Sequence, residues 1–558
     1  MTPTTLLGLL APLVAAGVYA LVGWRPATRW AGTLACAGLL ATAVDLAVTV
    51  TRTGPVTALD GAVRVDALSA FLLLVIGAVA VLAAAATPAH FATEIAARRA
   101  SARTAARHHV LVALFVTAMT AAVTAADLGV VWIMIEATTI CTAFLVGQRR
   151  TRASVEAAWK YVVVCSTGIA LALLGTLILH VVSAHAGGNG LDLAGLAALG
   201  PRLDPDATRI AVALLVIGFG TKVGLVPLHA WLPDAHSQAP APVSALMSGV
   251  LLSVAAYAVL RVKAVSDAAL GPAFLGVLLA VTALVTLAVV ASLLLAQRDY
   301  KRMLAYSSME HMALVTLGAA IGTRAAVAAA LLHVLGHGLA KAVLFLGAGR
   351  VLQLTGTSRI GEVRGLATRA PVLAGCLAAG LAALLGFPPF SLFASQLGIV
   401  TAGFAAGRGW ELAVALALIL VIAAALIGHG ARMLLGEPDV GVGAGGAASG
   451  RGGPRRPTRG AGPVVTAESV VAAESVVAAE RVVTAEPVVT AERVVTAEPV
   501  VTAERVGTAE PAAPPARVRA VPEAPVLIAG LVACAVLGLW AGPLQPLLDA
   551  AATAAGAR

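Results

Sequence analysis

Three ionisable residues lie in the middle of long apolar stretches of this chain. Glu136 lies in VVWIMIEATTI, Lys222 in LLVIGFGTKVGLVPLHAWLP and Lys341 in LLHVLGHGLAKAVLFLGAG. A charge at that depth of a bilayer is costly, so such residues are candidates for function. A carboxylate and a lysine that meet in a cavity stabilise each other's charged form, and separating them changes how tightly each holds a proton. The pattern indicates a proton relay. A static ion pair that fixes helix packing is the alternative for Glu136 and Lys222.

A stripe of polar residues precedes the third of these groups. His333, His337 and Lys341 follow one another at intervals of four residues, which places them on one face of a helix. Histidine titrates near neutrality, so this face can line a hydrated proton path. A metal site would need a third carboxylate or thiolate at helical spacing, so no metal is expected. Plain helix packing remains the alternative for the two histidines.

Polar residues near the ends of two apolar segments are possible accessory proton carriers. Glu310 and His311, in KRMLAYSSMEHMALVTLG, are expected near the cytosolic entrance of one segment. His229 is expected just inside the end of another, with Asp234 and His236 in the loop that follows. A solvated or helix-capping role stays open for each of the five.

The composition defines the class of protein that must position these groups. The chain has 558 residues, of which 59% are hydrophobic and 12% charged, and its mean hydropathy is +0.93. An average soluble domain is about half apolar and a quarter charged. A soluble enzyme, a disordered protein and a disulfide scaffold are therefore excluded, and a polytopic helical membrane protein is indicated. The net charge of +10 fits arginines in cytosolic loops, and no nucleic-acid partner is expected.

No cofactor is expected from the motifs. The five cysteines lie in apolar runs and none are spaced CxxC, whereas an iron–sulfur cluster or a structural zinc site needs clustered thiolates. The nearest approach to a phosphate-binding loop, Gly218-Phe-Gly220-Thr-Lys222, lies inside an apolar segment and is interpreted as a helix break. The N-terminal stretch lacks a basic region before its apolar run, so a retained first span is expected instead of a cleaved signal peptide.

The apolar segments predict an all-α membrane protein with about fourteen transmembrane helices. They lie near 4–23, 30–50, 66–86, 108–126, 128–147, 157–182, 208–230, 241–263, 273–296, 303–321, 325–349, 371–403, 408–433 and 525–548. With the N-terminus outside, the inside loops carry twice as many basic residues as the outside loops, and Lys301 is counted in one of the inside loops. The positive-inside rule therefore predicts a multi-pass protein of the cell membrane with both termini outside.

Two of these segments carry helix-breaking residues. Pro227 and Pro233 follow Lys222, and Gly386-Phe-Pro388-Pro389 interrupts the twelfth segment. Proline removes a backbone donor and clashes with the preceding turn, so both helices are expected to break in mid-membrane. Broken helices at corresponding positions of two halves point to an inverted repeat, in which segments 4–8 pair with segments 9–13.

The predicted organisation has four parts. Residues 1–107 form three N-terminal helices, 108–435 the translocating core and 525–558 a C-terminal helix. Between the core and the last helix, 436–524 is expected to be a disordered cytosolic insert, because a six-residue unit such as VVTAEP or VVTAER repeats there between Gly-, Arg- and Pro-rich stretches.

Four motifs carry a family resemblance over roughly residues 60–435. They are AAWKYVVVCSTGIALALLGT, TKVGLVPLHAWLPDAHSQAPAPVSALMSGVLL, AYSSMEHMALVTLG and HGLAKAVLFLGAG. These segments resemble the antiporter-like proton-channel family, which includes the large membrane subunits of respiratory complex I, Mrp cation antiporters and membrane-bound hydrogenases. The EAAWKY and YSSMEHM forms look most like hydrogenase-4 component F, followed by the M-type subunit of NADH–quinone oxidoreductase.

The resemblance implies a function and roles for particular residues. It implies a fourteen-helix fold with two five-helix inverted repeats, in which Glu136 and Lys222 form the coupling pair and Lys341 is the central relay reached through His333 and His337. It also implies a proton-translocating subunit of an oxidoreductase complex, with no redox centre of its own and with other membrane subunits, the lipid bilayer and protons as its partners.

Two departures from the family pattern keep other functions open. Gln396 stands where close relatives carry a Glu, and Ser253 stands where many carry a Lys or His. An amide cannot take up and release a proton, although it can order a water chain. Glu411, His429 or water would then have to carry the proton out. The alternatives are an Mrp-type cation/proton antiporter subunit and a non-conducting scaffold subunit.

Overall fold

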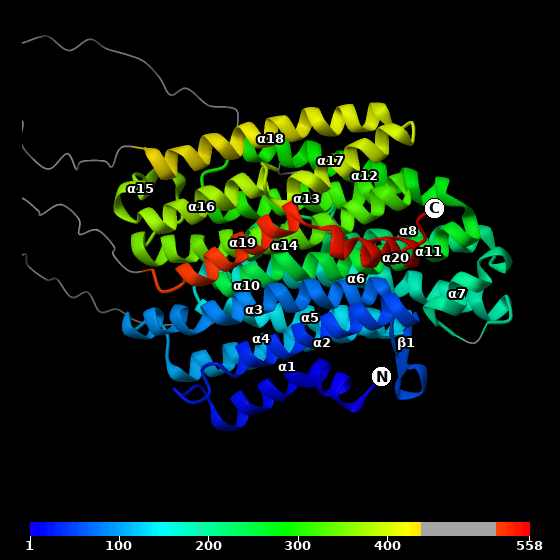
Figure 1. Cartoon of the computed structure of the whole chain (residues 1–558), viewed down its shortest axis with the longest axis horizontal. Coiled ribbons are helices and arrows are strands. Elements are labelled where there is room, and N and C mark those ends of the chain that lie inside the picture. The colour runs from blue at the N-terminus through cyan, green and yellow to red at the C-terminus, as the bar shows by residue number, and fades with distance from the viewer. Residues whose placement is uncertain (189, 437–520) are drawn as a thin grey trace, which may run out of the picture. The chain divides into compact units, whose positions relative to one another are not determined.

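The computed structural model describes residues 1–188, 190–436 and 521–558, and these residues are almost entirely helical. Most of the predicted low-complexity insert lies outside the described residues. Figure 1 shows long helices running side by side, with the C-terminal helices α19 and α20 in red along α14. The only sheet among the described residues is a short hairpin of β1 (Val56–Ala58) and β2 (Val63–Val65), with Val56 opposite Val65.

The helices have the following bounds. They are α1 Pro3–Val22, α2 Ala31–Thr53, α3 Ala67–Ala96, α4 Ala102–Thr124, α5 Leu128–Val146, α6 Arg152–His185, α7 Leu193–Leu199, α8 Pro205–Val223, α9 Trp231–Gln238, α10 Ala241–Leu246, α11 Leu252–Leu270, α12 Pro272–Leu295, α13 Tyr300–Ile321, α14 Arg324–Thr355, α15 Leu366–Arg369, α16 Pro371–Leu384, α17 Ser391–Ala405, α18 Gly409–Leu435, α19 Ala524–Leu539 and α20 Gln545–Ala554. Many begin after a Ser, Thr or Asp whose side chain accepts a hydrogen bond from the first turn.

The described helices account for the predicted segments. Ten are long and apolar enough to cross a membrane, and the pair α19 and α20, bent by 79°, makes an eleventh candidate. The three remaining predicted segments correspond to α13, which carries several charged residues, and to the broken pairs α8–α9 and α16–α17. The multi-pass helical architecture is thus confirmed, while the count of fourteen crossings stays a prediction.

Both predicted helix breaks are present. Helix α8 ends at Gly224, whose positive φ of 88° suits a residue without a side chain, and α9 starts only at Trp231. Helix α16 ends before Gly386, which also has a positive φ, and α17 starts at Ser391. Proline cannot donate the backbone hydrogen bond that either helix would need to continue.

Two irregularities were not predicted. The last segment bends sharply between α19 and α20. The eighth segment contains a π-helical turn, Met247–Leu251, between α10 and α11. There the backbones of Gly249 and Gly338 approach so closely that a Cβ added to either glycine would lie 3.0 Å from the carbonyl oxygen of the other. This contact joins the π-helical turn to α14.

The internal repeat is visible in matching helix starts. Asp127 caps α5 and Asp299 caps α13, each by accepting hydrogen bonds from backbone N–H groups of the first turn. Each aspartate also forms an isolated β-bridge with a residue beyond the next long helix, Asp127 with Asp192 and Asp299 with Arg359. A broken helix follows in both halves. In the predicted order of spans the two copies are five positions apart, and this odd number gives them opposite directions, as the predicted inverted repeat requires.

Burial separates central helices from peripheral ones. The most apolar stretches of 241–270 and of α14 are entirely or almost entirely buried inside the protein, whereas only about a third of those of α1, α2 and α18 is buried. The ionisable residues of α14 are therefore surrounded by protein. The outer helices expose apolar side chains such as Leu21, Leu34 and Leu420, as helices that face lipid do.

Candidate functional site

The first polar group joins α5 to α8 through a threonine. The Thr139 hydroxyl donates to Glu136 Oε2 over 2.9 Å and accepts from Lys222 Nζ over 2.6 Å. Ser166, on α6, donates to the other oxygen of Glu136 over 3.3 Å. The structure therefore brings Glu136 and Lys222 together, but with the threonine hydroxyl between them; none of the ion pairs recorded among the described residues joins the two directly.

Lys222 is held without access to solvent. Its side chain is fully buried, and Nζ also donates to the Tyr161 hydroxyl over 3.0 Å, with the Tyr161 ring centre 4.8 Å away. The Tyr161 hydroxyl in turn lies 2.6 Å from that of Thr142. Lys222 sits in the last turn of α8, two residues before the break. A lysine at the end of a helix is favourably placed relative to the helix dipole.

Helix α9 links this group to the second one. His236 is fully buried, and its ring is stacked 5.1 Å from the ring of Phe345 on α14 and lies 6.5 Å from Trp231. Neither ring nitrogen of His236 forms a hydrogen bond with a described protein group. This histidine therefore lies inside the protein and not in the loop where the sequence placed it.

Lys301 also differs from the prediction. It was assigned to a cytosolic loop, yet it lies in the first turn of α13 and is only 1% exposed. Its Nζ donates to the backbone oxygens of Ser237 and Ala239, each over 2.8 Å. These oxygens lie at the C-terminal end of α9, where free carbonyl groups attract a cation. The buried charge thus fastens α13 to the broken helix.

The second polar group surrounds Lys341. Its side chain is fully buried, and Nζ donates to the Leu304 carbonyl oxygen over 2.7 Å and to the Ser307 hydroxyl. Glu310, one turn further along α13, is 4% exposed and has one carboxylate oxygen without a described hydrogen-bond partner.

Three histidines continue from Lys341. His311 Nδ1 lies 2.9 Å from His333 Nε2, and His333 Nδ1 lies 2.9 Å from the hydroxyl of Ser395 on α17. The ring of His337 is centred 5.3 Å from that of His311, and neither of its nitrogens has a described hydrogen-bond partner. His311 was expected near the cytosolic entrance, but its contacts place it in the interior with the two histidines of α14.

The remaining predicted residues stay outside these two groups. His229 lies in the break after α8, and its ring Nδ1 forms a local hydrogen bond with the Pro227 carbonyl oxygen at 3.2 Å. The amide of Gln396 rests against the backbone of Gly386, where an added Cβ would lie 2.0 Å from its oxygen. Glu411 is paired over 2.7 Å with Arg408 at the start of α18.

A half-exposed ionic cluster lies beside the buried part of α9. Asp234 pairs with Lys160 of α6 over 3.2 Å and with Arg302 of α13 over 3.1 Å. The two basic side chains are 51% and 42% exposed, so this cluster reaches solvent or lipid headgroups. His236 follows Asp234 by two residues on the same short helix. Helix α9 therefore carries an acid that contacts exposed side chains, Asp234, and a buried imidazole, His236.

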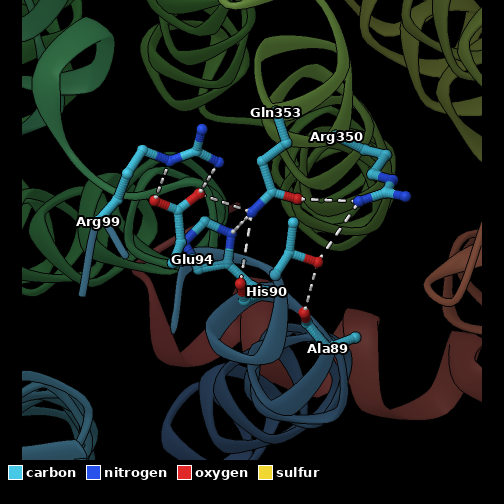
Figure 2. A network of polar contacts seen from close by, with 7 residues as sticks. Ala89, His90, Glu94, Arg99, Arg350 and Gln353 are labelled. Atoms are coloured by element: carbon cyan, nitrogen blue, oxygen red, sulfur yellow. Dashed lines mark hydrogen bonds and ion pairs between the residues drawn. The ribbon is translucent and has the colours of Figure 1, made fainter. Parts of the chain in front are cut away.

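A third polar network joins the ends of α3 and α14 (Figure 2). Glu94 accepts two hydrogen bonds from Arg99, over 3.0 and 3.1 Å, and one from Gln353 Nε2 over 2.9 Å. Gln353 also lies 3.1 Å from His90 Nδ1 and accepts from Arg350 over 3.3 Å. The bond to Glu94 raises the pKa of Arg99. No spacing in the sequence indicates this clamp, because its α3 side and its α14 side are more than 250 residues apart.

The donor types do not suggest a metal centre. Among residues 1–188, 190–436 and 521–558, no three His, Cys, Asp or Glu side chains converge on a common point as metal ligands would. The described cysteines are all free. The two interior groups combine a partly buried acid, Glu136, and a buried one, Glu310, with buried lysines and imidazoles, and hydroxyl groups lie among them. This is chemistry for moving protons.

Comparison with known proteins agrees with this architecture. Residues 125–423 match the family model described as NADH:quinone oxidoreductase/Mrp antiporter, transmembrane region. The chain is 38% identical over 335 residues to a hydrogenase-4 component F homologue of Methylacidiphilum infernorum, an alignment that covers 59% of this chain and 70% of the relative. It is 38% identical over 260 residues to NADH-quinone oxidoreductase subunit N of Desulforudis audaxviator, covering 45% of this chain but only half of that relative.

A solved structure has the same fold. The structure of the Mrp complex from Dietzia sp. DQ12-45-1b contains a chain with a TM-score of 0.75 and 22% identity, and the match covers 99% of this chain and 97% of that one. The family model covers more than half of the sequence, including both broken helices and both interior polar groups. The chain belongs to the NADH:quinone oxidoreductase/Mrp antiporter transmembrane family.

Proposed function

We propose that this protein is the proton-translocating membrane subunit of a hydrogenase-4-like or complex I-like redox assembly. Relatives named as hydrogenase-4 and NADH-quinone oxidoreductase subunits support the redox setting. Other membrane subunits of that assembly are the partners, and the redox chemistry belongs to them. The cell membrane is the location, with both termini outside, as the distribution of arginines in the loops indicates.

The proposed path has two stations and a link. Glu136 and Lys222 form the first station through Thr139, and Lys341 with its histidines forms the second. Helix α9 links them, because its His236 stacks on Phe345 of α14. The unpartnered nitrogens of His236 and His337 have hydrogen-bonding capacity that water molecules in the interior would use.

One observation carries the proposal. Lys222 and Lys341 are fully buried in separate halves of the protein, and each donates to hydroxyl or carbonyl groups. Within the described part of the chain, neither lysine has a carboxylate in direct contact. If the two lysines only held helices together, a direct ion pair or apolar side chains would stabilise the packing better, because a buried charge without a close partner is costly. Groups that gain and lose a proton in each cycle need this looser arrangement.

An antiporter component is the second candidate. The fold match to a chain of an Mrp complex supports it, because that chain aligns with nearly the whole length of this one. In this function the same buried groups would exchange protons for another cation without redox chemistry. Proton uptake by the purified complex that depends on a monovalent cation and needs no electron donor would favour this candidate.

The Glu136→Gln variant tests the relay. Glutamine keeps the shape and can still accept from Thr139, but it cannot hold the exchangeable proton. We expect assembly on native gels to be unchanged and redox-driven proton pumping into vesicles to fall by at least about tenfold, as for the loss of a positioned acid–base group. Glu362→Gln is the matched control, since Glu362 is half exposed and lies in the loop after α14.

Two results would count against the relay. Pumping at the wild-type rate would show that Glu136 carries no proton. Loss of assembly in Glu136→Gln alone would show that the carboxylate holds helices together, which is the static ion-pair interpretation.

A further inference from the structure

A large groove opens at the arginine-rich ends of four helices. Its volume is about 1390 Å³, and its walls come from α1, α4, α5 and α6. Typical small-ligand pockets hold roughly 300–1,000 Å³, so this groove has room for a larger molecule. It lies apart from the two interior polar groups, since neither Glu136, Lys222 nor Lys341 lines it.

The charges in the groove have one sign. Its lining includes five arginines and no acidic residue; these arginines are Arg99, Arg103, Arg107, Arg149 and Arg150. Arg99 is engaged by Glu94. In the described part of the chain, the recorded ion pairs give none of the other four an acidic partner. The groove therefore presents an unneutralised positive charge to whatever enters it.

Another part of the lining is apolar and exposed. Ile140 is 58% exposed, and Phe144 and Trp159 are each 66% exposed. These side chains lie nearer the middle of α5 and α6, whereas Arg149 and Arg150 lie near the ends of these helices. The groove is therefore basic at the helix ends and apolar towards the middle of the helices. A free inorganic anion would match only the basic end.

A buried polar group lines the same groove. His108 is 1% exposed, and its Nδ1 lies 2.8 Å from Gln148 Oε1. Its Nε2 forms no hydrogen bond with any described protein group. The Nε2 atom itself is shielded from solvent, so His108 gives this wall a buried and incompletely paired polar group.

We propose that this groove binds an anionic phospholipid. The phosphate lies among Arg103, Arg107, Arg149 and Arg150, and an acyl chain runs along Phe144 and Trp159. Basic pockets between transmembrane helices are suited to anionic headgroups, and a tryptophan is common where headgroups meet acyl chains. An acidic protein segment would pair with the arginines, but it would leave Ile140, Phe144 and Trp159 without apolar groups packed against them.

Lipid retention tests the proposal. The intact complex is reconstituted in nanodiscs of phosphatidylcholine containing phosphatidylglycerol, extracted into detergent and weighed by native mass spectrometry. We expect a phosphatidylglycerol molecule to remain bound in preference to phosphatidylcholine, and to be released as salt is raised, because screening weakens the attraction. The Arg103→Gln/Arg107→Gln variant should retain it about 25-fold less well, at about fivefold for each arginine.

The matched control removes two arginines elsewhere. Arg298→Gln/Arg432→Gln changes the charge equally, and both residues are exposed and do not line the groove. Equal retention in the groove variant and the control would overturn the proposal. So would the loss of a neighbouring protein subunit from the groove variant with unchanged lipid, because the groove would then be a subunit interface. The salt dependence of the unmodified complex checks the proposal without any variant.

Discussion

The bridge between Glu136 and Lys222 can be removed with almost no change of shape. Thr139→Val replaces the hydroxyl by a methyl group. Glu136 and Lys222 then each lose the hydrogen bond that they form with this hydroxyl. Lys222 keeps its contact with Tyr161. We therefore expect the helices to stay packed and the path between the two charged groups to lose its intermediate step.

The size of the effect follows from the two bonds. A hydrogen bond to a charged group contributes about 1.5–3 kcal/mol. If the loss of one such bond, about 2 kcal/mol, adds to the barrier for proton passage, the rate falls about 30-fold, since about 1.4 kcal/mol corresponds to a factor of ten. Loss of the second hydrogen bond of Thr139 lowers the rate further only when both bonds break in the same step of proton passage.

The assay is redox-driven acidification of vesicles that contain the intact complex. Electron transfer is followed in the same sample, so that slow turnover and uncoupling can be told apart. Thr138→Val is the matched control. Thr138 is the preceding residue of α5 and is fully buried, but its hydroxyl donates only to the Ile135 carbonyl oxygen.

Two outcomes would refute the reasoning. Pumping by Thr139→Val at the wild-type rate would mean that the proton does not pass this bridge. An equal loss in Thr138→Val would mean that any polar deletion at this point of α5 disturbs the protein, independently of the charged pair.

Three further predictions concern other points of the path. Gln396→Glu should leave translocation near its starting level or raise it modestly; absent flux in the native protein that is restored by this variant would show that the path is blocked at Gln396. His236→Phe should keep the stacking on Phe345 and the expression level but slow pumping by about tenfold or more, and unchanged pumping would remove His236 from the path. Deletion of 464–511 should leave insertion and pumping almost unchanged, because the proposed stations lie in the described helices; a clear loss of pumping in a well-expressed deletion would contradict this.

The membrane helices and their breaks could be predicted because they depend on local chemistry. Long apolar runs predict spans, and Pro227 and Pro388-Pro389 cannot continue a helix. The depth of Lys222 and Lys341 was predictable for the same reason, since both lie in the middle of such runs. Their burial in the structure agrees with that placement.

The contacts between distant segments could not be predicted in this way. Lys301 follows Arg298 and Asp299 in a charged stretch typical of a loop, and only the nearby end of α9 makes its burial favourable. Thr139 is one of two adjacent threonines, and nothing in the sequence distinguishes the one that faces Lys222. The clamp around Gln353 likewise requires α3 and α14 to meet.

The π-helical turn Met247–Leu251 sets the direction of the side chains that follow it. A π turn holds about one residue more than an α turn, and one residue of an α-helix corresponds to about 100° of rotation. Tyr257 and Arg261 are therefore offset by about that angle from where an unbroken α-helix would point them. In this orientation Arg261 forms two hydrogen bonds of 2.6 Å with Asp66, and Tyr257 reaches the Val123 carbonyl oxygen over 3.1 Å. The extra residue acts as an angular spacer, which lets one span pack against α14 at its beginning and bring Arg261 to Asp66 near its end.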